Sequence, residues 1–352
     1  MDRVLDAAIL GASGYTGGEL LRLLLGHQGV SVVYASSREY KGRPLHYAHP
    51  WLRGFYKGLR FSELNLDKVS EVDVVFNALP HGVGLEYTRQ LYEMGVIVVD
   101  LSADYRLKDP RLYEEWYGYT HPYPDLLSKA VYGLPELHRE ELKGARLIAS
   151  PGCNATATIL SIAPLVAKRL LREPILIISD IKAASSEAGS KPSRGNHHPE
   201  REGALRPYSA EGHRHSAEAE QELSGLSKVD VRVSIVPHAS PMTRGVFASS
   251  HSILNDGVSD SEVLKAYAEV YGGEFFIRIQ RNPPLRYPDV KNVLGSNMAD
   301  VGYAIESRVG RVTGFAAIDN LVRGAAGQAI QAFNIALGFE ESMGLLHPPL
   351  RP

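Results

Sequence analysis

Short apolar runs alternate with helix-like segments along the first half of the chain. Unbroken apolar strands joined by crossover helices are typical of a parallel sheet covered on both faces. Within the helix-like segments, apolar residues recur at intervals of three and four. The pattern predicts strands at Ala7–Leu10, Val30–Ala35, Val72–Ala78, Val96–Leu101 and Arg146–Ala149, and helices at Gly17–Leu25, Gly84–Met94 and Ala155–Leu171.

The second half has a different pattern, in which several strands are joined by short turns such as Val309–Arg311. This spacing favours a mixed or antiparallel sheet with helices on one face. Strands are predicted at Ile175–Lys182, Val231–Val236, Gly245–Ile253, Ala299–Ile305 and Gly314–Ile318, and a last helix at Gly324–Leu337. The polar segment Ala184–Gly212 is predicted to be a functional loop, because loops of that length are uncommon without a role.

Composition narrows the class of protein. A chain of 352 residues suits about two domains. The net charge of −2 provides no basic field for nucleic acid. No apolar run is long enough to span a bilayer, and the N-terminus lacks the features of a signal peptide, so we expect a cytoplasmic protein. A single cysteine excludes an internal disulfide and a multi-cysteine zinc site.

A glycine-rich turn, GASGYTGG at Gly11–Gly18, lies between the first strand and the first helix. Glycines in that position let the backbone approach a pyrophosphate at the helix N-terminus, although a structural turn is the alternative. The spacing is GxxGxxG, not the commoner GxGxxG. The residues predicted to bind a dinucleotide here are Gly11, Ser13, Gly14, Tyr15, Thr16 and Gly17.

The end of the second predicted strand indicates which dinucleotide is preferred. An NAD site usually has Asp or Glu there, whereas this chain has Ser36, Ser37 and Arg38. Hydroxyls and a guanidinium suit a 2′-phosphate better than a diol, so the sequence predicts NADPH. Two alternatives stay open: Arg38 as a solvated surface charge, and Glu39 pointing into the site in its place.

The cysteine lies in SPGCNAT, between a predicted strand and a predicted helix. A cysteine at a helix N-terminus is stabilised as the reactive thiolate by the macrodipole and the free N–H groups. The same N–H groups suit the oxygen of a tetrahedral adduct. We therefore predict that Cys153 is a nucleophile and that Asn154 helps to bind substrate; the alternative is a small, inert, buried cysteine.

A cysteine nucleophile usually works with a histidine, and the strongest candidate lies in GHRHSAE at Gly212–Glu218. Glu218 follows His215 by three positions, so on a helix that Ser216 opens or caps, the carboxylate faces the imidazole and orients it. His213 is the alternative base. A role as an ordinary surface histidine stays open for either residue.

The same polar loop carries six Lys or Arg and four Glu between Lys182 and Arg214, a local charge of +2. Such a loop suits a phosphate or carboxylate substrate, or an acidic partner, unless it is only a solvated surface. Its histidines lack the spacing of a zinc hydrolase, so no metal is expected. Candidate substrate-binding residues are His198 and Arg201, with Arg106 outside the loop, for which a structural ion pair is the alternative.

Seven segments spanning the chain carry a family resemblance: GASGYTGGELLRLL, ALPHGV, DLSADYRL, SPGCNATAT, HHPEREGA, GHRHSAEAEQ and AIDNLVRGAAGQA. The chain resembles N-acetyl-gamma-glutamyl-phosphate reductases and, more closely, their lysine-pathway relatives, which act on carrier-bound aminoadipyl phosphate. Asn-Ala-Thr after the cysteine and HHPERE in the loop favour the carrier-using branch. That branch uses the acidic LysW amino-group carrier protein, in lysine synthesis, arginine synthesis or both.

The resemblance implies a Rossmann domain, residues 1–152 and 320–352, whose C-terminal helix returns to it. It implies an α+β catalytic and dimerisation domain, residues 153–319, and a homodimer or homotetramer. It also implies that Cys153 is the nucleophile, that His215 and Glu218 are its partners, and that Asn320 lies beside the nicotinamide. A turn-forming role is the alternative for Asn320.

The expected reaction is reduction of an acyl phosphate by NADPH to a semialdehyde and phosphate, through a thioester on Cys153, with His215 moving the proton. Other hypotheses are a reductase of the free N-acetylated substrate, an aspartate-semialdehyde type of enzyme, and an NADP-sensing regulator of the same fold. A cysteine hydrolase is disfavoured, because it leaves the glycine-rich turn unexplained.

Overall fold

The computed structural model describes residues 3–351. The chain forms two compact units. The first unit contains the residues up to Tyr113, Tyr119–Pro151 and Ala325–Leu346, and the second contains Glu114–Gly118, Gly152–Gly324 and the residues from His347 onward. In residues 3–351, no helix is long and apolar enough to cross a membrane.

The first unit is built on a parallel sheet with the strand order β3-β2-β1-β4-β5-β7-β6. Central strands such as β1 and β4 are buried apolar runs, as expected for a sheet covered on both faces. The strands are β1 Leu5–Leu10, β2 Val30–Ser36, β3 Phe61–Ser62, β4 Val74–Asn77, β5 Ile97–Asp100, β6 Val131–Tyr132 and β7 Leu147–Ala149. The predicted parallel sheet is confirmed.

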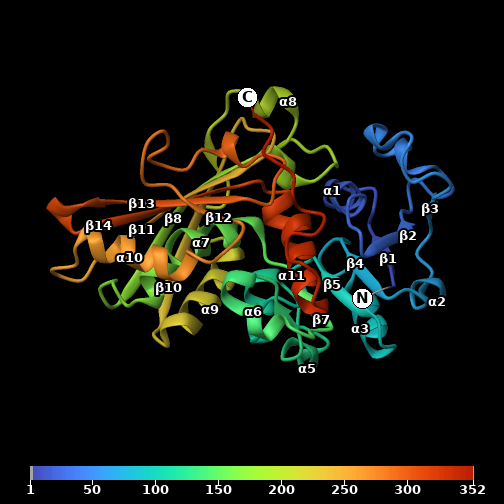
Figure 1. Ribbon diagram of the computed structural model, residues 1–352, viewed down its shortest axis with the longest axis horizontal. Coiled ribbons are helices and arrows are strands. Elements are labelled where there is room, and N and C mark those ends of the chain that lie inside the picture. Colours follow the sequence, from blue (N-terminus) through green and yellow to red (C-terminus); the bar gives the residue numbers. More distant parts are fainter. Residues whose placement is uncertain (1–2, 352) are drawn as a thin grey trace. The chain divides into compact units, whose positions relative to one another are not determined.

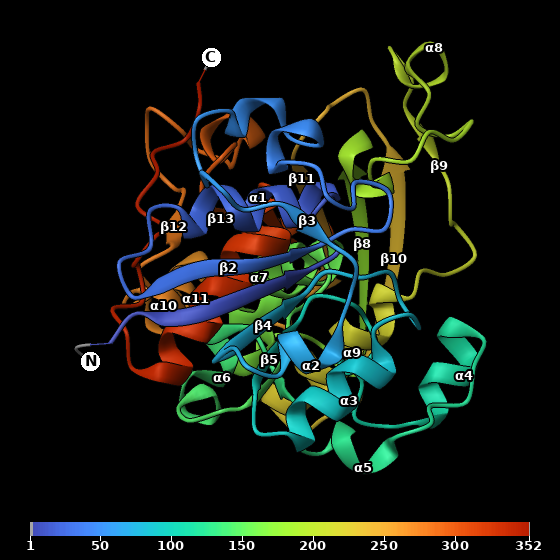
Figure 2. The same ribbon diagram turned by 90° about the vertical axis from the view of Figure 1, so that its right-hand side faces the viewer.

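Helices cover both sides of this sheet. The pair α1 and α11 pack together, as do α2 and α3, and Figure 2 shows the two pairs on opposite sides of the strands. The last helix, α11, also contacts β5 and β7, so Ala325–Leu346 belongs to this unit. The helices are α1 Tyr15–Leu24, α2 Leu66–Val69, α3 Leu85–Glu93, α5 Pro124–Leu127, α6 Pro135–Leu142 and α11 Gly327–Leu337, with 3₁₀ turns at Leu45–Tyr47 and Pro50–Leu52. Helix α4 Arg111–Tyr117 is divided between the two units after Tyr113.

The second unit is built on a mixed sheet with the order β12-β13-β14-β11-β8-β10-β9, in which β8 is parallel to β10 and antiparallel to β11. Helices α7, α9 and α10 lie along one side of this sheet (Figure 1), as predicted. The elements are α7 Cys153–Ala167, β8 Ile175–Ala183, α8 His198–Arg201, β9 Arg206–Pro207, α9 His215–Ser227, β10 Val231–Ala239, β11 Val246–Ile253, α10 Asp260–Tyr271, β12 Ile277–Ile279, β13 Ala299–Glu306 and β14 Arg311–Ile318.

Helix α7 is the centre of the second unit, because nearly all of its residues are buried against α9, α10, β11 and β14. Pro164 lies inside this helix and has no N–H to donate to the carbonyl of Leu160. The hydroxyl of Tyr271, on α10, donates to that carbonyl at 2.9 Å instead. Side chains from a neighbouring helix thus satisfy the backbone that proline leaves unpaired.

Some elements differ from the expectations. Helix α10 was not predicted, although Ser259 and Glu262 form a capping box at its start. The last helix begins at Gly327, after a π-helical turn at Val322–Ala326. The loop Ala184–Gly212 contains a 3₁₀ turn at Ser185–Ala188, helix α8 and strand β9, so it is partly structured.

Candidate active site around Cys153

Cys153 is the first residue of α7, and its side chain is partly exposed. Gly152 precedes the helix in an extended conformation and provides no side-chain cap. The N–H groups of the first turn therefore face the region of the thiol, and together with the helix dipole they favour thiolate. This placement is the one that the sequence predicted for a nucleophile, and the nucleophilic role of Cys153 stays a prediction.

His215 and Glu218 pack directly against the residue before the nucleophile. A Cβ atom added to Gly152 would lie only 2.4 Å from Nε2 of His215, so the ring occupies the space above this glycine. Oε2 of Glu218 accepts a hydrogen bond from the Gly152 N–H at 3.0 Å, and Oε1 lies 3.8 Å from Nε2 of His215. Both side chains are buried on the first turn of α9, so the predicted trio meets in one place.

The two candidate histidines, His213 and His215, have different environments in the structure. Nδ1 of His213 accepts the backbone N–H of His215 at 3.2 Å, and the two rings contact edge to face. Burial, with a smaller effect of the Arg214 charge, lowers the pKa of His213 to about 4. His213 is therefore neutral at pH 7 and holds the start of α9. Ser216 is not the N-cap, since its hydroxyl accepts the N–H of Ile235 at 3.2 Å and ties α9 to β10.

The turn after β14 approaches the nucleophile from another direction. A Cβ atom at Gly324 would lie 2.6 Å from Cβ of Cys153, so only glycine allows this approach. The buried carboxylate of Asp319 organises the turn by accepting hydrogen bonds from the Arg244 guanidinium and from the N–H groups of Gly295 and Leu321. This segment is therefore built around the position of the thiol.

Asn320 uses both ends of its amide inside the second unit. Its Oδ1 accepts the N–H of Gly245 at 2.7 Å, and its Nδ2 donates to Oγ of Ser186 at 2.9 Å. These contacts match the turn-holding alternative for Asn320. The proposed place beside a nicotinamide stays a prediction.

A carboxyl that the sequence reasoning missed lies beside the thiol. Glu187 hydrogen-bonds with the side chains of Asn154 and Cys153 and interacts with the charge of Arg201. Burial raises the pKa of Glu187 to about 8, although those three contacts oppose the rise. Tyr208 joins the group through a hydrogen bond with Asn154 and through the charge of Glu187. The only sequence signal was an acidic residue inside a basic loop.

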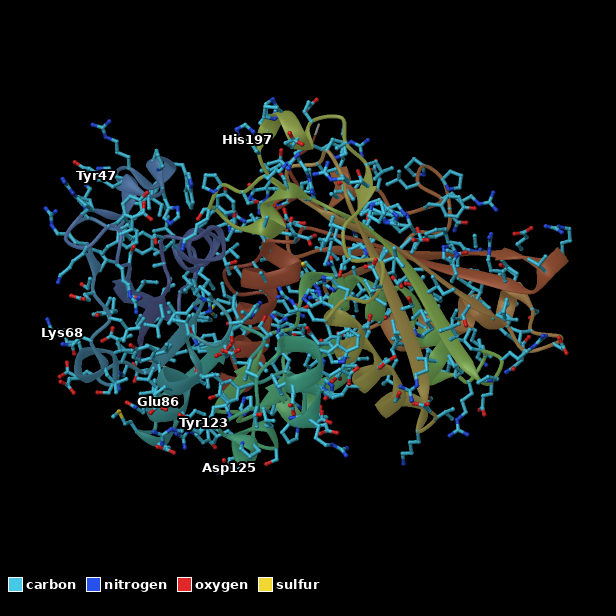
Figure 3. The ribbon with its side chains drawn as sticks, turned by 180° about the vertical axis from the view of Figure 1, so that it is seen from behind. Tyr47, Lys68, Glu86, Tyr123, Asp125 and His197 are labelled. Carbon is cyan, nitrogen blue, oxygen red and sulfur yellow. The ribbon has the colours of Figure 1, made fainter. Side chains whose placement is uncertain are left out.

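The loop residues divide into two sets. Arg201 reaches the cluster around the thiol and donates to the carbonyl of Ala183. His198 is exposed on α8, as are Lys191 and Arg194 just before it, and Figure 3 shows the neighbouring His197 at the outer end of this segment. The structure brings Arg201, one of the two predicted loop ligands, close to the nucleophile. Within residues 3–351, it shows no contact between the nucleophile and the other one, His198.

The glycine-rich turn of the first unit has the shape of a phosphate cradle. Gly11 has a φ of +74°, and a Cβ atom there would lie 2.6 Å from the carbonyl oxygen of Ala78. A Cβ atom at Gly17 would lie 2.6 Å from Cα of Ala12. Gly14 caps α1 without a side-chain hydrogen bond, which leaves the first-turn N–H groups for an anion. The donor set therefore fits a dinucleotide pyrophosphate.

The serines near this turn support its conformation. Oγ of Ser36 accepts the N–H of Gly11 at 3.0 Å, and the hydroxyl of Ser37 donates to Oγ of Ser13 at 2.9 Å. The side chains of Arg38 and Glu39 are exposed, so either is accessible to a ligand. A role for these residues in binding the cofactor stays a prediction.

Arg106 has contacts that hold the backbone. Its Nε donates to the carbonyl of Ser150 at 2.7 Å, and its Nη2 donates to the carbonyl of Leu101 at 3.1 Å. The side chain is almost fully buried. These bonds support a structural role for Arg106, with backbone carbonyls as the acceptors.

Comparison with known proteins identifies the family. The domain described as the NAD binding domain of semialdehyde dehydrogenase matches residues 6–145, and the dimerisation domain of the same enzymes matches residues 153–320. The chain is 60% identical over 99% of its length, and 100% of the relative's, to the [LysW]-L-2-aminoadipate/[LysW]-L-glutamate phosphate reductase of Sulfurisphaera tokodaii. The chain belongs to this family of phosphate reductases. The corresponding enzyme of Saccharolobus solfataricus is 58% identical, over 98% of each chain.

Solved structures agree with this family at the level of the fold. Aspartate semialdehyde dehydrogenase II from Vibrio cholerae, complexed with ASA, has a TM-score of 0.71 and covers 95% of this chain and 98% of its own. The enzyme from Candida albicans, with NADP, has a TM-score of 0.67 and covers 94% and 98%. Identities of 14% and 18% show a shared fold. The predicted fold class, a Rossmann domain with an α+β semialdehyde-dehydrogenase domain, is confirmed.

Proposed function

We propose that this reductase converts a carrier-linked 2-aminoadipyl 6-phosphate, glutamyl 5-phosphate or both to the semialdehyde and phosphate, using NADPH, in lysine or arginine biosynthesis. The observation that carries the proposal is the partly exposed Cys153 at the start of α7, with His215 and Glu218 packed against the preceding glycine. The names of relatives that are 57–60% identical supply the substrate class.

Cys153 attacks the acyl carbon as thiolate, the bond to the phosphate oxygen breaks, and a thioester forms. The N–H groups at the start of α7 stabilise the charge on the acyl oxygen during attack. NADPH, when bound, supplies the hydride that reduces the thioester. His215 moves the proton at the resulting oxygen, and Glu218 holds the ring while accepting the Gly152 N–H.

The proposal assigns the cofactor to residues 1–152 and 320–352, and the chemistry to residues 153–319. Gly11, Gly14 and Gly17 cradle the pyrophosphate, and Arg38 binds the 2′-phosphate. Two features support this assignment: the cradle that a Cβ atom would fill, and the absence of an acidic residue at the end of β2 except for the exposed Glu39.

The partner that we propose is the acidic LysW-type carrier. The exposed Lys191 and Arg194, which lie close to His197 and His198 in the sequence, offer positive charge to it. The match to a dimerisation domain supports a homodimer or homotetramer.

Single-turnover assays with free N-acetylated and carrier-linked acyl phosphates, run side by side, test the function. We expect reduction of the carrier-linked substrate and formation of a thioester that Cys153→Ser abolishes. Binding of NADPH, measured by fluorescence, should persist in this variant. Equal activity on the free substrate would favour an N-acetyl-gamma-glutamyl-phosphate reductase, and no activity on either, with NADPH binding retained, would favour an NADP-sensing protein.

A further inference from the structure

We propose that Glu187 accepts the thiol proton of Cys153 when the sulfur attacks and delivers that proton to the departing phosphate. This inference rests on the proposed function and adds a second acid–base group to it. Glu187 interacts with the reacting sulfur, whereas His215, the partner expected for a cysteine nucleophile, packs above Gly152.

The position of Glu187 is the first argument. Its carboxyl hydrogen-bonds with the thiol of Cys153 and with the side chain of Asn154, the next residue of α7. Oδ1 of Asn154 in turn lies 3.8 Å from the sulfur. A carboxylate in this position receives a proton from the thiol without any movement of the backbone.

The way the segment is held is the second argument. Glu187 lies on the 3₁₀ turn Ser185–Ala188, whose backbone donates to the carbonyls of Met242 and Thr243. The hydroxyl of Ser186 accepts a hydrogen bond from the buried amide of Asn320 at 2.9 Å. Anchors on both sides of the turn keep the carboxyl at the thiol, as proton transfer requires.

The surroundings of the carboxyl are the third argument. Oε1 of Glu187 and Nε of Arg201 are both buried, and neither has a hydrogen-bond partner in residues 3–351. Arg201 provides the positive charge that faces Glu187, and Tyr208 completes the wall. A buried acceptor and a buried donor at one place suit a ligand that needs both, such as a departing phosphate.

The proton affinity of Glu187 is the fourth argument. Burial raises the pKa of Glu187 to about 8, and the start of α7 favours thiolate at Cys153. The Glu187 carboxylate is therefore a strong enough base to take the thiol proton. Transfer to this carboxylate forms the thiolate without sending a proton into water.

The step balances without an added co-reactant. The S–H bond of Cys153 breaks as the O–H bond on Glu187 forms, and the thiolate then attacks the acyl carbon. The acyl–oxygen bond breaks, and the proton on Glu187 moves to the leaving oxygen, so that phosphate departs as hydrogen phosphate. The carboxylate is restored, and the thioester remains on sulfur. In the later reduction of the thioester and release of the aldehyde, His215 moves the proton at the acyl oxygen.

Glu187→Gln tests the step, because the amide keeps the shape and loses the ability to carry the proton. Mixed with the acyl phosphate alone, the variant should release its single turnover of phosphate about a hundredfold more slowly than the wild type. NADPH binding should be unchanged. Glu200→Gln, on the exposed side of α8, is the matched control and should behave as the wild type. Phosphate release at the wild-type rate from Glu187→Gln would overturn the proposal.

A second measurement needs neither the Glu187→Gln variant nor the substrate. Difference infrared spectra across the ionisation of the thiol should show a protonated carboxyl that appears together with thiolate, and that is missing in Cys153→Ser. Thiolate that forms without a protonated carboxyl would overturn the proposal. If the wild type reduces no acyl phosphate but shows this band, the proposed function fails while the shared proton stands.

Discussion

At the residue scale, the site contains two neighbouring histidines in different environments. His213 is enclosed between Tyr208 and His215 and accepts a backbone N–H, so a proton on its Nδ1 would break that bond. Its pKa, lowered to about 4, follows from burial. Because His213 resists protonation, it holds His215 at the start of α9 over the pH range in which the enzyme works.

His213 should make stability fall in acid. Its unfolded pKa of about 6.5 lies above the folded value of about 4, so the unfolded chain takes up the proton first as the pH falls through this window. The loss is on the order of 3 kcal/mol between pH 6.5 and 4. Chemical denaturation of His213→Gln should show a smaller loss of unfolding free energy than the wild type over this pH range. An identical pH dependence in the two proteins would contradict the lowered pKa.

Arg38 should decide between the two dinucleotides. Arg38→Ala removes the cation expected at the 2′-phosphate, and we expect the KM for NADPH to rise about ten- to a hundredfold while the KM for NADH stays near its original value. Steady-state kinetics with both cofactors measure this change. Arg53→Ala, another exposed arginine of the first unit, is the control. An equal loss with both cofactors would rule out the assigned contact.

At the element scale, α7 is held at its first residue by segments far apart in sequence. Gly152 lies under the ring of His215 on α9, and Gly324 brings the turn after β14 against Cys153. Oε2 of Glu218 accepts the N–H of Gly152 at 3.0 Å. Close backbone packing therefore positions the thiol. This packing requires glycine, which has no side-chain methyl group, at Gly152 and at Gly324.

Gly324→Ala should displace the thiol. The added methyl would lie 2.6 Å from Cβ of Cys153, far inside van der Waals contact, so one of the two segments must shift. We expect acylation of Cys153 to slow by tenfold or more, because a shift of about 1 Å in a reacting group has effects of that size. Rapid-quench measurement of thioester formation checks this.

Gly225→Ala is the matched control for this change. Gly225 lies inside α9, and a Cβ atom there meets no atom within 4 Å. The control should keep full acylation and gain up to about 1 kcal/mol of stability from helix propensity. An equal effect of the two substitutions would show that the close approach at Gly324 has no role.

At the scale of the whole molecule, the outer face of the mixed sheet carries exposed apolar side chains among polar ones. The strand β8 alternates buried and exposed residues, and its exposed positions include Leu176 and Ile178, at 52% and 43% exposure. Ile253 on β11 is exposed as well. Exposed apolar side chains on a sheet suit an interface between copies, and the family match describes residues 153–320 as a dimerisation domain.

Lysines on this face should dissociate the oligomer. Leu176→Lys combined with Ile178→Lys places two charges where copies are expected to meet, and burial of an unpaired charge is costly. Sedimentation velocity should show a smaller species than the wild type. Leu264→Lys, an exposed apolar position on α10, should leave the mass unchanged. An unchanged mass for the double variant would place the interface elsewhere.

Local patterns predicted the elements well and the site in part. Patterns among neighbouring residues predicted the buried apolar runs of β4 and β5 and the apolar spacing of α7. The capping box at Ser259 and Glu262 was also a local signal, and it was overlooked. The register of β8 between β10 and β11 had no such signal, because strand pairing joins residues far apart in the chain.

The sequence by itself determined the alternation of parallel and mixed sheet elements, the glycine-rich turn, the cysteine at a helix start and the spacing of His215 and Glu218. All of these depend on residues within a few positions of one another. Only the tertiary structure decided that His213 is neutral, that Asn320 holds Ser186, and that Glu187 lies at the thiol. Burial and long-range contact set those properties, and neither is encoded in any short stretch of the chain.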